Sequence, residues 1–282
     1  MKKNYDSLTM RDNFLFCKIL EKREDLCKRM IEVITGREVK EITNLRTEES
    51  AKSTLGGKGV RYDVTFQDDE ATVYDMEMQT SDTGSLPRRS RYYQSMIDTS
   101  CLDSGDPYED LPKSMVIFIC TFDFFGKERH VYTFEPRCIQ DASIALDDGT
   151  CRIFLNTEGK DEIDSECKDL LEFIAGRAVN GKLANMLQDE VDIAKKNEKW
   201  RSEFMQNMAF YMDAVREGKQ EGRQEGILEG RQEGILEGRQ EAKEETQIEM
   251  FLNCVAKGMD EKEAQDLVGM SDELVAKALS QK

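Results

Sequence analysis

The chain has 282 residues, of which 39% are hydrophobic and 34% are charged, and its formal net charge is −17. This composition supports one substantial domain together with a strongly solvated remainder. The acidic balance argues against a protein that coats nucleic acid or an anionic membrane over its whole surface, but it leaves room for a local basic groove.

The scarcity of histidine narrows the chemistry further. His130 is the only histidine, so histidine-based catalytic schemes are excluded unless they use this residue. The eight cysteines form no CxxC pair, which argues against a zinc site, and several lie in apolar runs such as VIFICTF. Reduced, buried thiols of this kind indicate a cytoplasmic protein.

No segment has the composition of a membrane anchor. Nothing approaches the roughly 18 uninterrupted apolar residues of a membrane-spanning helix. In the N-terminal sequence MKKNYDSLTMRDNFLFCKIL, the apolar residues are interrupted at positions 11–13, which indicates an amphipathic helix rather than a signal peptide. We therefore expect no membrane partner.

Residues 1–215 have the pattern of one domain that combines helices with a sheet. Apolar residues recur at helical spacing over 8–35, and this pattern ends at Gly36. Between about residues 40 and 155 lie short runs rich in β-branched and aromatic residues: VRYDVTF, ATVYDMEMQ, KSMVIFICTFDF, RHVYTFEP and CRIFLN. One helix candidate, SRYYQSMIDTSCL, lies between the second and third of these strands, and helical spacing returns over 161–215.

A low-complexity tract covers residues 216–245. The octapeptide GRQEGILE occurs at 222–229 and again at 230–237, and GRQEAKEE follows it. Each glycine destabilises a helix by about 1 kcal/mol relative to alanine. The Ile-Leu pairs repeat every eight residues, which fits no heptad seam. We expect a marginal helix or a flexible spacer.

Residues 246–282 resemble a small tail of short amphipathic helices. Met259-Asp260 and Ser271-Asp272 stand where we expect the junctions between these helices. A small helix-turn-helix and a protein-docking module are equally compatible with this pattern. The tail and the repeat tract together also allow self-association into a homo-oligomer.

The segment VRYDVTFQDDEATVYDMEMQ, residues 60–79, predicts a β-hairpin with one polar face. Because alternate residues of a strand face opposite sides, the apolar and polar positions separate cleanly in both runs. With QDDEA as the loop, Phe66 lies opposite Thr72 and Asp63 lies opposite Asp75. Glu77 is then diagonal to Asp63, at a distance of about 7 Å.

This polar face has the composition of a metal site. Its members are Asp63, Asp75, Glu77 and Gln79. Magnesium is typically held by one or two carboxylates with waters and substrate phosphates, so Asp63 and Glu77 can share one ion. The alternative is a half-exposed hairpin whose outer face is simply polar, as in most alternating strands.

These residues also carry a family resemblance. Asp63 followed fourteen residues later by Glu-Met-Gln resembles the D…(D/E)xK core of the PD-(D/E)XK nuclease superfamily. The ordered series GVRYDV, YDMEMQ, LPRRSRYYQSMID and GDPYEDLPKSMVIFICTFDFF is similar to the PD-(D/E)XK nuclease family of transposases, also called recombination-promoting nucleases. MRDNFLFCKIL and the glycine-glutamate tract extend the resemblance over nearly the whole chain.

The resemblance implies an α/β, restriction-endonuclease-like core, with a mixed central β-sheet flanked by helices and an α-helical C-terminal extension. It also implies cleavage of DNA phosphodiester bonds with Mg²⁺, or Mn²⁺ in its place, and Asp63 and Glu77 as metal ligands. Gln79 stands where the superfamily usually has lysine. This departure matters because an uncharged amide cannot stabilise developing phosphate charge as an ammonium does.

Chemistry at the residue level agrees in outline. A metal ion polarises the scissile phosphate and lowers the pKa of an attacking water, and Gln79 can orient that water. The backbone carbonyl of Met78 can add a ligand. Asp75 shares the face without belonging to the motif, so we expect it beside the ligands rather than on the metal. Asp12, where the family pattern also tends to have Asp, either approaches the metal or caps its helix.

The segment LPRRSRYYQ offers positive charge next to the hairpin. We expect a helix that begins near Pro87 and contacts the DNA backbone. The candidate DNA-contacting residues are Arg88, Arg89, Arg91, Tyr92 and Gln94. The alternative is an ordinary helix start whose arginines pair with surface carboxylates.

The sequence therefore predicts a metal-dependent DNA endonuclease, with links to recombination, mobile elements or genome defence. The first alternative is a degenerate nuclease that binds DNA or protein without cutting, which the missing lysine and the acidic charge favour. The second is an assembly protein built around the repeat tract and the tail. The predicted domains are 1–215, 216–245 and 246–282.

Overall fold

The computed structural model describes residues 4–52 and 57–280. Contacts divide the chain into two compact units, Met1–Gln206 and Asn207–Lys282. Within the described residues, no helix combines the length and the apolar character that crossing a membrane requires.

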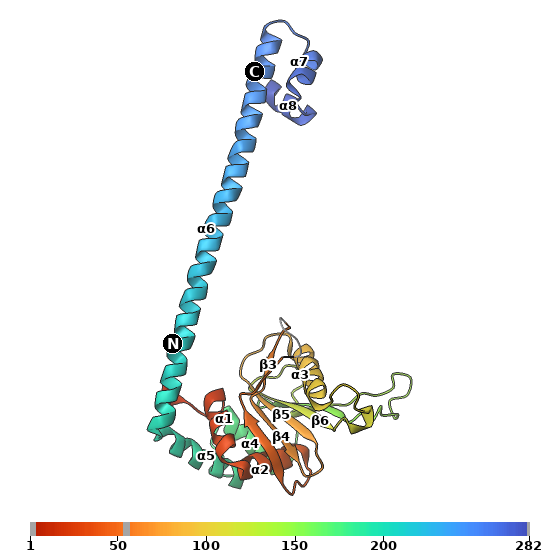
Figure 1. The fold of residues 1–282 in the computed structure, drawn as a ribbon, viewed down its shortest axis with the longest axis vertical. Coiled ribbons are helices and arrows are strands. Elements are labelled where there is room, and N and C mark those ends of the chain that lie inside the picture. Colours follow the sequence, from red (N-terminus) through yellow and green to blue (C-terminus); the bar gives the residue numbers. More distant parts are fainter. Residues whose placement is uncertain (1–3, 53–56, 281–282) are drawn as a thin grey trace. The chain divides into compact units, whose positions relative to one another are not determined.

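A mixed sheet forms the centre of the first unit (Figure 1). Among the described residues it has six strands in the order β1-β4-β5-β6-β8-β7. Their bounds are β1 (Ile42–Thr47), β4 (Val64–Asp68), β5 (Val73–Gln79), β6 (Ser114–Cys120), β7 (Val131–Phe134) and β8 (Thr150–Asn156). β5, β6 and β8 run parallel, whereas β1, β4 and β7 pair antiparallel with their neighbours. The predicted mixed α/β fold is confirmed.

The central strand β6 explains why both faces of the sheet are covered. Its sequence SMVIFIC is buried at every position, as expected for a parallel strand with helices on both sides. α3 (Leu86–Cys101) covers one face, and the other carries α1 (Asn13–Lys22), α2 (Glu24–Thr35), α4 (Ser165–Ala175) and α5 (Lys182–Lys195) (Figure 1). The short elements η1 (Tyr5–Ser7) and η2 (Tyr108–Asp110) lie before α1 and before β6.

Beneath α3 the sheet and the helix share one apolar core. It contains Val60, Tyr62, Leu86, Tyr93, Met96, Ile97, Val116, Phe118, Cys120 and Phe154. In the parallel register, Asp75, Glu77 and Gln79 of β5 lie beside Val116, Phe118 and Cys120 of β6. The polar positions of the hairpin therefore face this core and not the solvent.

The run VRYDVTF, predicted as one strand, is interrupted in the middle. β3 (Val60–Arg61) pairs with β2 (Ser50–Ala51), and β4 begins only at Val64. Between them, the N–H of Tyr62 donates to the carbonyl of Glu49 at 2.9 Å. This interruption leaves Asp63 at a bend, where its own N–H is available to a side chain.

The predicted hairpin register was wrong. Phe66 pairs with Tyr74, not with Thr72, and Thr65 pairs with Asp75. The loop contains only residues 69–71, because Asp68 N–H bonds to the Thr72 carbonyl at 3.1 Å and Ala71 adopts a φ of +60°. The shift is one residue on each strand, so the polar faces still coincide, and the continued register places Glu77 rather than Asp75 opposite Asp63.

The second unit consists of a long helix with two short ones at its end. α6 (Glu198–Ala256) has 59 residues, begins in the first unit and runs through the repeat tract without interruption. At the six glycines from Gly218 to Gly238, an added Cβ would meet nothing within 4 Å. Packing among the described residues therefore does not require glycine at these positions.

The end of α6 packs against α7 (Glu261–Val268) and α8 (Asp272–Ser280). Their shared apolar cluster contains Ile248, Phe251, Ala264, Met270 and Ala278. The Asp260 side chain caps α7 by accepting from the N–H of Lys262. The short amphipathic helices predicted for the tail are thus confirmed, with junctions at the expected residues.

We expect Phe251→Ala to unfold the α7–α8 end without changing the stability of the first unit. Phe251 is fully buried, and truncation of a buried phenylalanine costs about 3–5 kcal/mol. In calorimetry of the full chain, the thermal unfolding transition of the first unit should keep its wild-type midpoint. Leu267→Ala is the control, since Leu267 is 68% exposed. Loss of both transitions in Phe251→Ala would contradict two separately folded units.

Candidate active site

The polar face of the hairpin is buried under α3. Asp63 and Gln79 are 7% exposed, Glu77 is 1% exposed and Asp75 is fully buried. Half-exposed strands ordinarily turn polar residues toward water. The alternative of a hairpin with a solvent-exposed polar face is therefore wrong, because these polar residues are buried. Burial of so many ionisable groups is costly unless each has partners or a function.

Asp63 and Glu77 hold each other through the backbone. The N–H of Asp63 donates to Glu77 Oε1 at 2.8 Å, and the N–H of Met78 donates to Asp63 Oδ2 at 2.9 Å. These two bonds replace the strand ladder at the bend before β4. Both carboxyl groups are therefore fixed side by side by backbone donors.

Asn13, at the start of α1, completes the surroundings of Asp63. Its Nδ2 donates to Asp63 Oδ1 at 2.8 Å, and its Oδ1 accepts from the Cys17 thiol at 2.7 Å. The Cys17 thiol also lies 3.3 Å from the Asp63 carbonyl. Sequence reasoning did not identify Asn13, because a contact between residues fifty positions apart leaves no periodic signal.

Asp75 lies deeper than the other two carboxyl groups. Neither of its oxygens accepts a hydrogen bond from a donor within the described residues. Burial, followed by the negative charges of Glu77 and Asp63, raises its pKa well above the ordinary value. When Asp75 is protonated it can donate a hydrogen bond to Glu77, and this bond also raises the pKa of Asp75.

The two motif carboxyl groups are shifted the same way. Burial raises the pKa of Asp63, while the Met78 N–H and the Asn13 amide oppose this change. Burial and the negative charge of Asp63 raise the pKa of Glu77 to about 8. Perturbed carboxyl groups collected in one place are typical of a functional site.

Arg89 supplies the positive charge of the site. Its Nη2 lies 2.5 Å from Glu77 Oε2 and donates to the Tyr93 hydroxyl at 2.8 Å, while Nη1 donates to Gln79 Oε1 at 2.8 Å. The guanidinium also lies over the rings of Tyr93 and Phe118, at 4.8 and 5.3 Å from their centroids. Arg89 was predicted as a DNA contact, and the fold brings it directly to the carboxylates.

Gln79 is oriented by hydrogen bonds at both ends of its amide. Its Nε2 donates to the Ser81 carbonyl at 2.5 Å, and its Oε1 accepts from Arg89. The carbonyl oxygen that we expected to orient a water is thus bonded to a guanidinium in this structure. Gln79 and Glu77 together hold the guanidinium of Arg89 at the carboxyl groups.

The remaining candidate residues divide by exposure. Arg88, Arg91 and Tyr92 are exposed on α3, where they can meet a ligand. Gln94 is only 3% exposed and donates to Ser114 Oγ, so the prediction that it contacts DNA does not match its position in the core. The carboxylate of Asp12 accepts from the N–H of Thr9 at 2.8 Å; its neighbour Asn13 makes the contact with Asp63.

The donor set fits a hard divalent cation that uses few protein ligands. No cluster of three or more His, Cys, Asp or Glu side chains suited to a metal ion occurs among the described residues. Asp63 and Glu77 nevertheless present two adjacent carboxylates, which is the number that magnesium typically takes from a protein. The Met78 carbonyl, from the same strand, is the third candidate.

Comparison with known proteins identifies this region. A family model described as PD-(D/E)XK nuclease family transposase matches residues 13–148. The matched segment contains Asp63, Glu77, Gln79 and Arg89. The searches of curated proteins and of solved structures found no match to the chain.

We expect Glu77→Gln to stabilise the metal-free protein more at about pH 8 than at about pH 5. The pKa of Glu77 rises from 4.5 to about 8 on folding, so the folded state binds the proton more tightly. Its contribution to the free energy of unfolding is full below the unfolded pKa and is lost as the pH rises through the folded pKa. The amide of the variant does not titrate, so it avoids this loss.

Urea denaturation in EDTA at the two pH values measures this effect. Glu70→Gln is the matched control, because Glu70 is exposed in the hairpin loop. An equal stability difference at both pH values would show that Glu77 does not titrate between them.

Proposed function

We propose that the chain is a metal-dependent DNA endonuclease, because residues 13–148 match the model of the PD-(D/E)XK nuclease family of transposases and because the geometry of the site suits this activity. The observation that carries the proposal is the buried pair Asp63–Glu77 with Arg89 bound to both Glu77 and Gln79. The reaction is hydrolysis of a phosphodiester bond. Recombination, mobile elements and genome defence are the settings in which such cutting would serve.

Asp63, Glu77 and the Met78 carbonyl would hold the divalent cation, Mg²⁺ or Mn²⁺. When bound, it supplies charge to the scissile phosphate and lowers the pKa of the attacking water. The bonds from the Asp63 and Met78 N–H groups keep both carboxylates in place before the ion arrives. Such preorganisation reduces the reorganisation needed during the reaction.

Arg89 takes the role of the missing lysine in this proposal. Its guanidinium is always protonated and presents a planar fork suited to phosphate oxygens. Gln79 and Tyr93 fix two of its nitrogen atoms, so the charge is held at the carboxylates rather than in solvent. With a cation on Glu77, Arg89 is no longer its main counter-charge and can bind the developing charge on phosphate.

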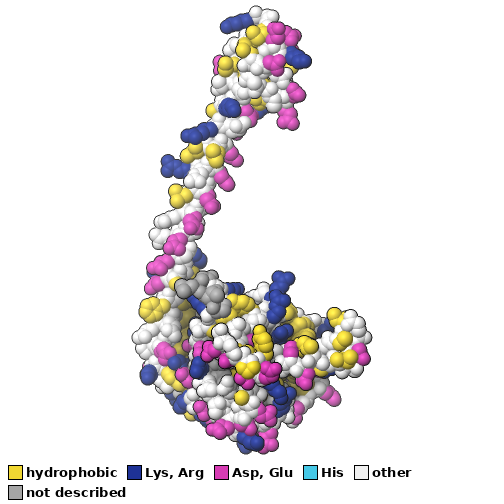
Figure 2. Space-filling model, turned by 45° about the vertical axis from the view of Figure 1, so that its right-hand side comes forward, with side chains coloured by type: hydrophobic (Ala, Val, Ile, Leu, Met, Phe, Trp, Pro, Cys, Tyr) yellow, Lys and Arg dark blue, Asp and Glu magenta, His cyan; other side chains and the backbone are white. Residues whose placement is uncertain are grey.

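The exposed part of α3 would contact the DNA backbone. Arg88 and Arg91 supply charge, and Tyr92 adds a hydroxyl and a ring. Figure 2 displays acidic and basic side chains interspersed over the visible face of the first unit, so we expect a local contact rather than a basic surface. A DNA substrate and cysteines without disulfides fit a cytoplasmic protein.

Self-association through α6 is a second proposal, which does not depend on catalysis. Ile227, Leu228, Ile235 and Leu236 are all exposed on the repeat tract, between glycines with open space beside them. A solitary helix gains little from such residues, whereas a second copy can bury them. A nuclease that has lost cutting but kept DNA binding is the remaining alternative, and Gln79 is the feature that favours it.

We expect Asp63→Asn and Glu77→Gln each to abolish plasmid cleavage in Mg²⁺ or Mn²⁺. Either change removes a negatively charged oxygen that a hard cation needs, while the side-chain volume is kept. Gel electrophoresis of supercoiled plasmid with wild type, both variants and EDTA measures the loss. Glu70→Gln should cut normally. Wild-type protein that neither cuts DNA nor binds a metal in calorimetry would contradict the proposal.

For Arg89, we expect Arg89→Met to slow cleavage by about 10²–10³-fold, the usual cost of losing one preorganised charge donor. The double variant Gln79→Lys/Arg89→Met should recover part of the rate, because lysine returns a cation to the same place. Arg88→Met should instead weaken DNA binding and its salt dependence. If lysine at position 79 gives no recovery, Arg89 acts by holding Glu77 and not by its charge on phosphate.

A further inference from the structure

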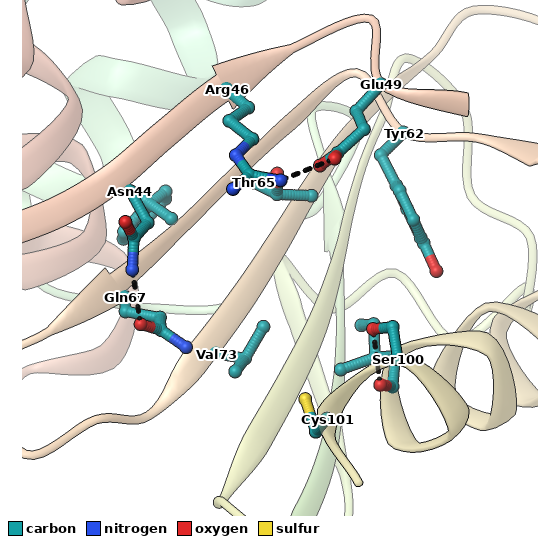
Figure 3. Close-up of a pocket in the computed structure, with 11 residues that line it drawn as sticks. Asn44, Arg46, Glu49, Tyr62, Thr65, Gln67, Val73, Ser100 and Cys101 are labelled. Carbon is teal, nitrogen blue, oxygen red and sulfur yellow. Dashed lines mark hydrogen bonds and ion pairs between the residues drawn. The ribbon is translucent and has the colours of Figure 1, made fainter. Parts of the chain in front are cut away.

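A cavity of about 210 Å³ opens on the same face of the sheet as the carboxylates (Figure 3). Gln67 of β4 and Val73 of β5 are paired across the hairpin and contribute to its lining, as do Ile97 and Cys101 of α3. Val73 and Glu77 point to one side of β5, and four residues of strand separate them by about 13 Å. The cavity is therefore close to the proposed cutting site without being part of it.

One wall of the cavity is an aromatic ring with an unused polar group. Tyr62 is 5% exposed, and its hydroxyl has no hydrogen-bond partner within the described residues. An unpartnered buried hydroxyl costs about 1–3 kcal/mol. In Figure 3 the ring stands at the side of the cavity with its hydroxyl directed toward α3. The hydroxyl oxygen is itself buried, so a ligand that enters the cavity would meet the ring rather than this group.

The opposite rim carries amides that a local irregularity aims at the cavity. β1 and β4 shift register between Thr43 and Arg46, and Asn44 adopts the left-handed conformation with a φ of +54°. Bulges of this kind redirect side chains and are enriched beside functional sites. Here Asn44 Nδ2 donates to Gln67 Oε1 at 2.8 Å, so the two amides form one edge with further donors and acceptors free for a ligand.

The charge of the cavity is balanced. Arg46, which lines it, bonds to Glu49 at 2.6 Å (Figure 3). The carboxylate of Glu49 offsets the charge that would attract a phosphate. The chemistry instead suits a flat, neutral molecule with a hydrogen-bonding edge. Amide side chains of this kind pair with base edges, and aromatic rings stack on base faces.

We propose that this cavity receives a nucleobase of the DNA strand that is cut, extruded from its stack near the scissile phosphate. The inference rests on the proposed function, since it takes its ligand from a DNA substrate. Extrusion of a base into a shaped pocket costs a few kcal/mol, and this cost makes cutting sensitive to the sequence or pairing at that position. The Asn44–Gln67 edge would read the base, and Tyr62 would contact its ring.

The cavity also has a connection to the cutting site. The Tyr62 ring meets the Tyr93 ring edge-on at a centroid distance of 5.5 Å, and the Tyr93 hydroxyl accepts from Arg89. A base that moves Tyr62 thus acts on the residue that positions Arg89. This contact gives the bound base a route to change the cleavage rate as well as affinity.

Cys101 offers a direct readout, because its thiol lines the cavity while Cys138 and Cys254 lie elsewhere and are similarly exposed. The full chain is alkylated with iodoacetamide in Ca²⁺, and mass spectrometry follows all three cysteines. The probes are an intact DNA duplex, an abasic strand of equal length and adenosine monophosphate. Fluorescence anisotropy confirms that each DNA probe is bound, and a gel confirms that it stays uncut.

We expect the intact duplex to slow alkylation of Cys101 at least about tenfold, which corresponds to about 1.4 kcal/mol of protection. Cys138 and Cys254 should be unaffected, and the abasic strand should not protect Cys101. Gln67→Leu should weaken the protection while the exposed control Gln188→Leu leaves it intact. Gln67 is half-buried at the rim, so neither change disturbs the core.

Three outcomes would overturn the inference. Equal protection by the abasic strand would assign the effect to the DNA backbone, and protection by adenosine monophosphate alone would assign the cavity to free nucleotides. Bound duplex without protection would leave a cavity that holds only water. Plasmid cleavage is measured on the same preparation: cutting without protection refutes the base pocket alone, whereas absence of both DNA binding and cutting refutes the proposed function together with it.

Discussion

The site depends on two backbone N–H groups that hold two buried carboxylates against their mutual repulsion. Asp63 lies at the bend before β4 and Glu77 lies on β5; Glu77 accepts from the N–H of Asp63, and Asp63 accepts from the N–H of Met78. Charge-assisted bonds of this kind are among the stronger ones in a protein. Burial still raises the pKa of both groups, and the positive charge of Arg89 opposes this change. The rest of the local fold positions Arg89.

Alternation along the hairpin was enough to predict which residues share a face, but not how far the strands slide. The period of two decides sides, and a shift of one residue on both strands preserves it. The real register depends on Ala71 in the left-handed conformation and on Asp68 closing a three-residue loop, which no glycine or asparagine signals. For the same reason the break at Tyr62–Asp63 was invisible. It results from the pairing of β3 with β2 and not from any local breaker.

Contacts between distant segments account for the other differences. The run of arginines predicted a charged helix beside the hairpin, and that helix exists as α3. Sequence spacing could not tell that Arg89 turns inward while Arg88 and Arg91 stay in solvent, because the position of the sheet decides which side of a helix is buried. Likewise, the acidic residue Asp12 drew attention, whereas its neighbour Asn13 reaches Asp63. A neutral amide can bond to a carboxylate without adding a further negative charge.

α3 links the chemistry to the neighbouring cavity through one row of side chains. Arg89, Tyr93, Ile97 and Cys101 are spaced four apart, so they follow one side of the helix. Arg89 bonds to Glu77 and Gln79, and Tyr93 packs against the ring of Tyr62. Ile97 and Cys101 line the cavity beside Val73. β5 presents Val73, Asp75, Glu77 and Gln79 to this same side, so Arg89 meets Glu77 at one end of the row, while Ile97 and Cys101 share the cavity with Val73 at the other. The base proposed for the cavity would therefore contact the same side of α3 that positions Arg89.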